Sequence, residues 1–82
     1  MQRNNRAIKA VLQHIEKSEE SAVEQHEIID SVTKAEKVGV EEATYHLELC
    51  IEGRLVSLTK SEQPKVRLTW KGHDTLDKLR RL

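Results

Sequence analysis

The side chains of this sequence most typical of zinc sites and of proton transfer near neutral pH are one cysteine and four histidines: Cys50, His14, His26, His46 and His73. Metal sites usually show short pairings, such as histidines four residues apart or cysteines separated by two residues. No such pairing occurs here, and no nucleophile, base and orienting group follow a recognisable pattern. We therefore expect no metal, no cofactor and no enzymatic activity.

A second group of side chains could bind phosphates. Lys and Arg supply most contacts between proteins and the nucleic-acid backbone, and they cluster in a predicted hairpin and near the amino terminus. The candidate contacts to double-stranded DNA are Arg3, Arg6, Tyr45, Lys60, Lys65 and Arg67. A simpler interpretation stays open, in which the hairpin charges are solvated and only discourage edge-to-edge pairing of strands.

Three amphipathic helices precede the hairpin. Apolar residues recurring three and four positions apart predict helices over about residues 4–17, 26–37 and 41–52. Residues 22–25 are expected as a short extended piece before the second helix. Gly39 and Gly53 are expected to end the second and third helices, because glycine readily takes positive φ.

The hairpin is predicted from two alternating runs, about residues 54–60 and 65–70, joined by residues 61–64. Val66, Leu68 and Trp70 share one face of the second run. Because the chain has no Phe, Trp70 is expected as the largest piece of the core. A last helix over about residues 70–82 is capped by the Thr69 hydroxyl. Three helices, a two-stranded wing and a closing helix make one α+β winged helix-turn-helix domain over residues 1–82.

Charge is balanced but unevenly distributed. Lys and Arg total 14 and Asp and Glu total 14, so no global positive field attracts the chain to DNA. The third helix, residues 41–52, carries four glutamates and no Lys or Arg. Its carboxylates would oppose a polyanion, so the wing and the basic amino terminus are the expected DNA contacts. The alternative is a protein-interaction module that docks a basic partner on the acidic face of the second and third helices.

The sequence argues against a membrane-spanning protein, a secreted protein and a protein with an internal disulfide. No apolar run is long enough to span a membrane, no signal peptide begins the chain, and a lone cysteine cannot form an internal disulfide. These features indicate a cytoplasmic protein. Leu76, Leu79 and Leu82 form a narrow apolar stripe on the last helix, which either pairs two copies as a homodimer or packs within the chain.

Two segments of the sequence resemble known proteins. Residues 44–56, TYHLELCIEGRLV, look like the passage from recognition helix to wing in bacterial winged-helix proteins. Residues 68–77, LTWKGHDTLD, resemble the closing segment of an uncharacterised family of small bacterial, phage and prophage proteins, described as a domain of unknown function. The residues that carry this signature are His46, Trp70, Gly72, His73 and Asp74.

The resemblance implies a winged-helix fold and a phage or prophage origin. Because the family has no established activity, the expected role of a non-enzymatic, DNA-associated regulator rests on the fold and on the basic wing and amino terminus. His46 and His73 are expected as structural residues that join the third helix to the start of the last one beside Trp70. One departure concerns the turn after the third helix, where the resembling proteins usually have Ala-Gly and this chain has Gly53-Arg54. The left-handed residue of that turn is therefore either shifted or Arg54 itself.

Overall fold

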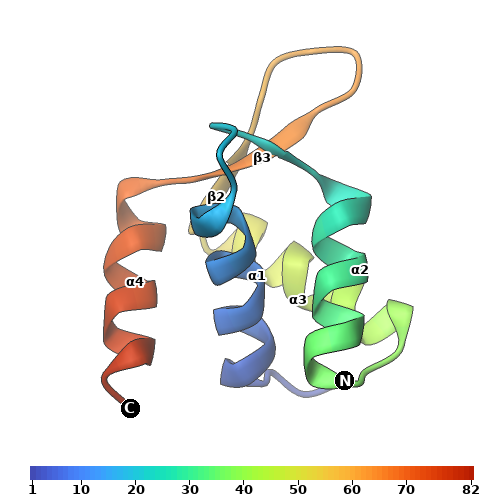
Figure 1. Cartoon of the computed structure of the whole chain (residues 1–82), viewed down its shortest axis with the longest axis vertical. Coiled ribbons are helices and arrows are strands. Elements are labelled where there is room, and N and C mark those ends of the chain that lie inside the picture. Colours follow the sequence, from blue (N-terminus) through green and yellow to red (C-terminus); the bar gives the residue numbers. More distant parts are fainter.

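The computed structural model describes all residues, 1–82, and places four helices beneath a small three-stranded sheet (Figure 1). This arrangement is a winged helix, so the predicted fold class is confirmed. The elements follow in the order α1 (Asn5–Lys17), β1 (Val23–Glu24), α2 (Gln25–Glu36), α3 (Val40–Glu52), β2 (Val56–Leu58), β3 (Lys65–Leu68) and α4 (Trp70–Arg80).

Helix α1 is the central element of the fold. It begins at Asn4, whose side chain accepts a hydrogen bond of 2.9 Å from the backbone N–H of Arg6. Its buried stripe packs against α2, α3, α4 and β3. The stripe consists of Ala7, Ile8, Val11, Leu12 and Ile15. None of the four helices is long and apolar enough to cross a bilayer.

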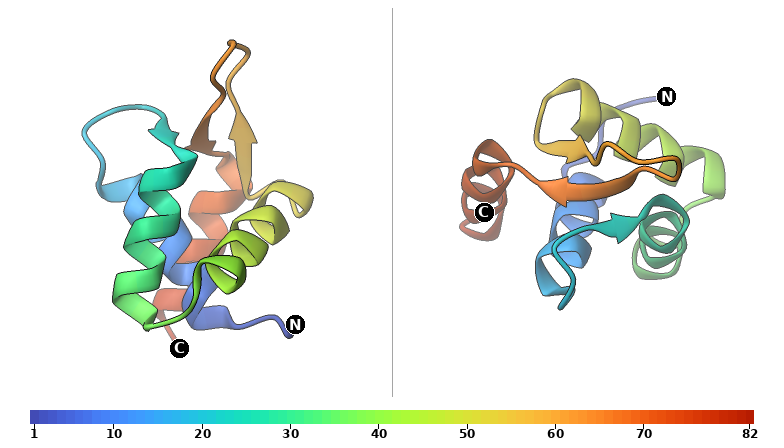
Figure 2. Two further views of the ribbon diagram at one scale, coloured as in Figure 1. Left: turned by 90° about the vertical axis from the view of Figure 1, so that its right-hand side faces the viewer. Right: turned by 90° about the horizontal axis from the view of Figure 1, so that it is seen from above.

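A tight turn joins α2 to α3 and makes the helix-turn-helix pair (Figure 2). Helix α2 ends at Lys37, which takes the left-handed conformation with φ of 54°. Gly39 has φ of −74° and is the residue that precedes α3. The prediction that Gly39 ends α2 through positive φ is therefore wrong, because the chain reverses two residues earlier.

The turn after α3 is built on Arg54, which has φ of 60°. Gly53 before it has φ of −78°. The backbone N–H of Leu55 donates to the carbonyl of Cys50 at 2.9 Å, and that of Arg54 donates to the carbonyl of Ile51 at 3.1 Å. These bonds are those of a helix ending in a left-handed residue. The left-handed position is thus Arg54, one of the two alternatives that the sequence left open, and not Gly53.

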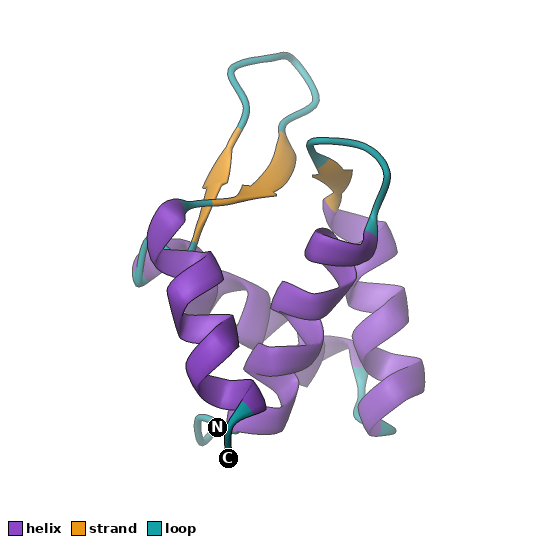
Figure 3. Cartoon of the chain, turned by 60° about the vertical axis from the view of Figure 1, so that its left-hand side comes forward, coloured by secondary structure: helices purple, strands orange, loops and turns teal.

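The sheet has three antiparallel strands in the order β1-β3-β2, rather than the two predicted. Val23 of β1 pairs with Val66, and on the other edge of β3 Val56 pairs with Leu68. The side chains of Val23, Val56 and Val66 are buried against the helices. Figure 3 shows the strands and the wing loop rising above the helices. A two-residue strand has too short an alternation to be recognised by period, so β1 was expected only as an extended piece.

One hydrophobic core of 14 buried residues is built from aliphatic side chains, Ala and Cys50. Trp70 is not part of it, because 85% of its surface is exposed. The prediction of a core tryptophan is wrong: the strand β3 ends at Leu68, so the alternation that placed Trp70 inside stops before it reaches that residue. Trp70 instead opens α4, on the side of the helix away from the core.

Helix α4 is fixed to the rest of the fold by Thr69 and Gly72. The Thr69 hydroxyl donates to the carbonyls of Arg54 and Leu55, at 2.7 and 3.0 Å, and accepts from the N–H of Gly72 at 3.0 Å. A Cβ atom on Gly72 would lie 2.0 Å from the Leu55 carbonyl oxygen. Only glycine therefore allows the first turn of α4 to lie this close to the α3–β2 turn.

Candidate nucleic-acid interface

The outer face of α3 is acidic. Ala43, His46, Leu47 and Cys50 point into the core and Ile51 packs against it, whereas Glu41, Glu48 and Glu52 are exposed. No cationic side chain lies within 4.0 Å of the carboxylates of this helix. These carboxylates are Glu41, Glu42, Glu48 and Glu52. The carboxylates of helix α3 would therefore repel the phosphates of a polyanion such as DNA rather than bind them.

Tyr45 lies on α3 in a half-buried position. Its ring meets the ring of His46 edge-on, with centroids 5.3 Å apart and an angle of 88° between the planes. Edge-to-face contact of this kind is a favourable arrangement of two rings and restrains the tyrosine side chain. Of the predicted DNA contacts, Tyr45 is the one that α3 itself presents.

His46 is fully buried and joins the amino-terminal segment to α3. Its Nε2 accepts from the backbone N–H of Asn4 at 2.9 Å, and its Nδ1 donates to the carbonyl of Glu42 at 2.8 Å. These partners require the neutral tautomer with the proton on Nδ1. His73 is exposed on α4. The predicted link between His46 and His73 beside Trp70 is therefore wrong, since His46 holds Asn4 instead.

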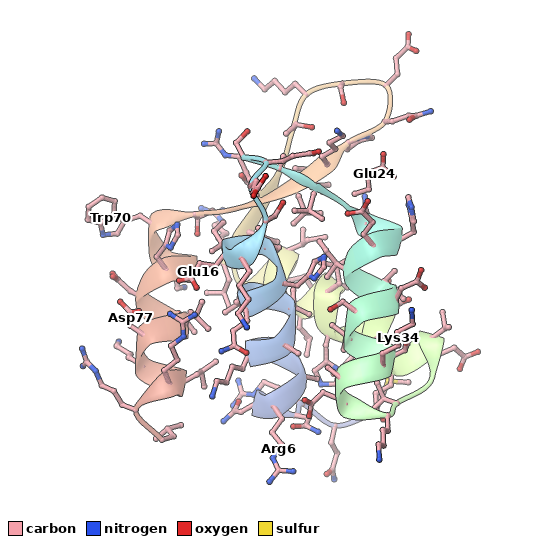
Figure 4. All side chains as sticks on the ribbon, in the orientation of Figure 1. Arg6, Glu16, Glu24, Lys34, Trp70 and Asp77 are labelled. Atoms are coloured by element: carbon pink, nitrogen blue, oxygen red, sulfur yellow. The ribbon has the colours of Figure 1, made fainter.

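The two amino-terminal arginines lie on different surfaces. Arg3 lines a shallow depression together with Glu42, at the start of α3. Arg6 lines a groove of about 330 Å³ between α1 and α2, which also contains Lys9 and Lys17. Figure 4 places Arg6 at the end of α1 farthest from the wing. The structure therefore brings Arg3, but not Arg6, to the α3 surface.

The wing carries three basic residues in different environments. Lys60 is exposed in the loop and Arg67 is exposed on β3, opposite Ser57. Lys65 is half-buried, and its Nζ lies 3.8 Å from a carboxylate oxygen of Glu20. The charge of Lys65 is therefore partly neutralised within the chain. Lys60 and Arg67 have no ion-pair partner and remain available to phosphates.

The wing loop is closed by Thr59. Its backbone N–H donates to the carbonyl of Lys65 at 2.9 Å, and its hydroxyl accepts from the N–H of Lys65, also at 2.9 Å. The Ser61 hydroxyl donates to the carbonyl of Gln63 at 2.9 Å and tightens the tip. These bonds hold Lys60 beyond the end of β2, at the tip of the hairpin.

The signature residues divide into two groups. His46 and Gly72 are buried and determine how elements pack. Trp70, His73 and Asp74 are exposed on α4, and their side chains make no hydrogen bond or ion pair within the chain. Figure 4 shows Trp70 at the outer edge of the molecule, pointing away from the helices.

Comparison with known proteins gives one family. The model of a family described as "Hypothetical protein (DUF2513)" matches residues 2–81. The chain belongs to this DUF2513 family. The expected membership of an uncharacterised family is thus confirmed. No curated protein matches the sequence.

Among solved structures, the DUF2513 chain is similar to Staphylococcus aureus MarR, solved in complex with salicylate and kanamycin. The TM-score is 0.62 and the sequence identity is 19%. The match covers 90% of this chain and 48% of that one, so the DUF2513 chain spans about half the length of its structural neighbour. The likeness supports the winged-helix fold.

One cluster in the DUF2513 chain had no signal in the sequence. Potential metal-binding atoms of Glu24, His26 and Glu27 lie within 4.8 Å of one another, and all three side chains are exposed. His26 Nδ1 lies 3.2 Å from a Glu24 carboxylate oxygen, so these two side chains contact each other directly. The three residues surround the start of α2, where carboxylates are favoured by the helix dipole whether or not an ion is bound.

Proposed function

We propose that this chain is a non-enzymatic DNA-binding module that uses its wing more than its recognition helix. The proposal is supported by the α2-turn-α3 pair, since the second helix of a helix-turn-helix is the element that enters the major groove. The three-stranded sheet adds a wing beside it. A regulatory role in the cytoplasm, and an origin in a phage or prophage, are expectations that accompany the proposal.

The observation that carries this proposal is the distribution of unpaired charge around α3. Lys60 and Arg67 on the wing and Arg3 at the amino terminus flank the helix, whereas its own outward residues are acidic. Phosphate contacts supply most non-specific affinity. Contacts from two or three such residues give a salt dependence with a log–log slope of about −2 to −3, at about −0.9 per phosphate. The expected affinity is therefore modest and steeply reduced by salt.

Fluorescence anisotropy of a labelled mixed-sequence duplex tests the proposal. We expect binding at about 50 mM salt that weakens at about 200 mM. Charge reversal of Lys60 and Arg67 should weaken binding further, whereas replacing Lys34 by Gln on α2 provides a control in which one charge is lost away from the wing. Replacing Glu41 and Glu42 by Gln should strengthen binding if α3 approaches the duplex. Absence of binding at the lower salt concentration would contradict the proposal.

A second candidate function is docking of a basic protein on α3. It is favoured by the carboxylates of Glu41, Glu48 and Glu52, which have no partner in the chain, and by Val40, which is 62% exposed at the start of the same helix. Unpaired charge around an exposed apolar residue is typical of an interaction surface. A lysine-rich peptide that binds the wild-type chain, but not a Glu41→Gln, Glu48→Gln variant, would support this function over DNA binding.

A further inference from the structure

A groove between α1 and α2 gathers positive charge on the face of the molecule opposite α3. In Figure 1 these two helices lie side by side, and α3 lies behind them. The groove has a volume of about 330 Å³, at the lower end of the range for small-molecule sites. Its polar lining consists of Arg6, Lys9, Gln13, His14 and Lys17 from α1, with Ser31 and Glu36 from α2.

The polar side chains of this groove have no partners within the chain. None of the seven makes a side-chain hydrogen bond or an ion pair. Four of them are nevertheless half-buried, so neighbouring residues restrict the positions of their polar atoms: Lys9, Gln13, His14 and Ser31. Such restriction lowers the entropy cost of binding a ligand.

The charge of the groove matches a dianion. Arg6, Lys9 and Lys17 are permanent cations and Glu36 is the one carboxylate in the lining, which leaves a net charge of +2 when histidine is counted as neutral. A phosphate monoester carries about −1.5 to −2 at pH 7 and has three strong acceptor oxygens. We propose that the α1–α2 groove binds a small sugar phosphate.

The rest of the lining favours a sugar phosphate over a nucleotide. Nucleotide bases are commonly held by stacking on aromatic rings. The two aromatic residues of the chain, Tyr45 and Trp70, are not in the groove, whose apolar lining is limited to Ala10 and Ala35. A base would therefore find no surface to stack on, whereas hydroxyl groups would find polar partners.

The direction of the two helices indicates how the ligand lies. Helices α1 and α2 run in opposite directions, so Glu36 at the end of α2 lies at the same end of the groove as Arg6 (Figure 1). No carboxylate lines the other end, which holds His14 and Lys17. The phosphate should therefore bind at the His14–Lys17 end, and a sugar hydroxyl should donate to Glu36.

Isothermal titration with glucose 6-phosphate, in the absence of DNA, tests the proposal. We expect a dissociation constant of about 1 mM or tighter, because a ligand of this size makes only a few contacts. Inorganic phosphate should bind more weakly, and glucose should not bind measurably. No binding of glucose 6-phosphate at about 10 mM overturns the proposal. Equal affinity for inorganic phosphate, or tighter binding of adenosine monophosphate, would show that the groove does not recognise a sugar phosphate.

Variants test the role of each end of the groove. Lys17→Gln should weaken binding of glucose 6-phosphate about tenfold, as loss of a hydrogen bond from a charged group does. Glu36→Ala should lower the preference for glucose 6-phosphate over inorganic phosphate, because it removes the hydroxyl acceptor and a negative charge. Lys78→Gln, an exposed lysine on α4 outside the groove, is the control and should bind as the wild type does. Unchanged binding by Lys17→Gln would overturn the proposed site.

Amide chemical shifts place the ligand independently of these variants. Glucose 6-phosphate should move the resonances of residues 9–17 and 31–36, and leave those of the wing unchanged. Shifts confined to the wing would contradict the site.

DNA also carries phosphates, so the same variants distinguish the two sources. The groove lies opposite α3, and Lys17→Gln should therefore weaken duplex binding less than charge reversal of Lys60 and Arg67. If Lys17→Gln weakens duplex binding more than it weakens glucose 6-phosphate binding, the groove is a DNA-backbone surface and the proposal is overturned. A chain that binds the sugar phosphate but no duplex would refute the proposed DNA-binding function alone.

Discussion

Arg80 of α4 donates hydrogen bonds to both carboxylate oxygens of Glu16 at the end of α1. The bond from Nη1 to Oε2 measures 3.1 Å, and Asp77 lies 3.9 Å from the same guanidinium. This fork joins two helices whose paired residues are 64 positions apart in the sequence. It adds a polar contact to the apolar packing of α4 on α1.

The Glu16–Arg80 pair should make stability depend on pH in the acidic range. The hydrogen bonds from Arg80 hold the pKa of Glu16 below its ordinary value of 4.5. A lowered pKa in the folded state adds stability above the unfolded-state pKa, and this contribution is lost as the pH falls through the folded-state value. Urea unfolding of Arg80→Gln should show a smaller difference from the wild type at acidic pH than at neutral pH. Arg81→Gln, which removes an exposed and unpaired charge, should show no such trend.

Replacing Gly72 by Ala should destabilise the fold by about 3 kcal/mol, the upper part of the range for overpacking. The reason is that the added methyl group meets the backbone oxygen of Leu55, which cannot move without opening the α3–β2 turn. Gly39→Ala is the matched control, since nothing lies within 4 Å of its Cβ position. Chemical unfolding measures both. Equal stability of the two variants would contradict the close approach of α4.

Replacing His46 by Leu should cost about 1–3 kcal/mol, because the N–H of Asn4 loses its acceptor. The fluorescence of Trp70 in the folded state should not change, since Trp70 is solvated and His46 contacts Asn4 and Glu42. His73→Leu is the control and should leave stability nearly unchanged. A shift of the emission maximum in the His46 variant would argue for a contact with Trp70 that the structure does not have.

Cys50 should be unreactive in the native protein. It is fully buried, and loss of solvation raises the pKa of its thiol to about 12. The thiolate is the reactive form, so modification by Ellman's reagent near neutral pH should require unfolding. The reaction should become rapid in urea. Immediate labelling of the native chain would show that the α3 packing is open at this position.

Replacing Arg54 by Gly should stabilise the protein by about 0.5–1 kcal/mol. Arg54 has φ of 60°, a conformation that costs a residue with a Cβ atom more than it costs glycine. Arg54→Ala separates this effect from the loss of charge, because alanine keeps the strain. Thermal unfolding should therefore rank the glycine variant above both the wild type and the alanine variant.

Helical periodicity and the hairpin pattern were sufficient to predict the fold class. The stripe from Ile8 to Ile15 and the alternation around Val66 both reflect burial on one face, which local sequence encodes directly. Turn geometry was less accessible, because Lys37 takes the left-handed conformation that Gly39 was expected to take, and the sequence left open whether Arg54 would take it after α3. Glycine is preferred in the left-handed conformation only on average. At the end of α3 the backbone hydrogen bonds determine which residue takes that conformation.

The sequence predicted which basic residues could form the candidate interface, but not where each of them lies in the fold. Lys60 and Arg67 follow from the hairpin itself, so their exposure on the wing could be anticipated. The separation of Arg3 from Arg6 depends on where α1 begins, and the neutralisation of Lys65 depends on Glu20, which lies far away in the sequence. Trp70 was misplaced because an alternating pattern does not reveal where a strand gives way to a helix.

Strand β3 is paired on both edges, with β2 on one side and β1 on the other. Because β1 leads directly into Gln25, the first residue of α2, the wing is mechanically coupled to the helix-turn-helix pair. A hairpin paired only with itself could swing on its base, whereas this one cannot tilt without pulling the start of α2. A partner that displaces the wing would therefore also act on the start of α2, through the pairing of β1 with β3.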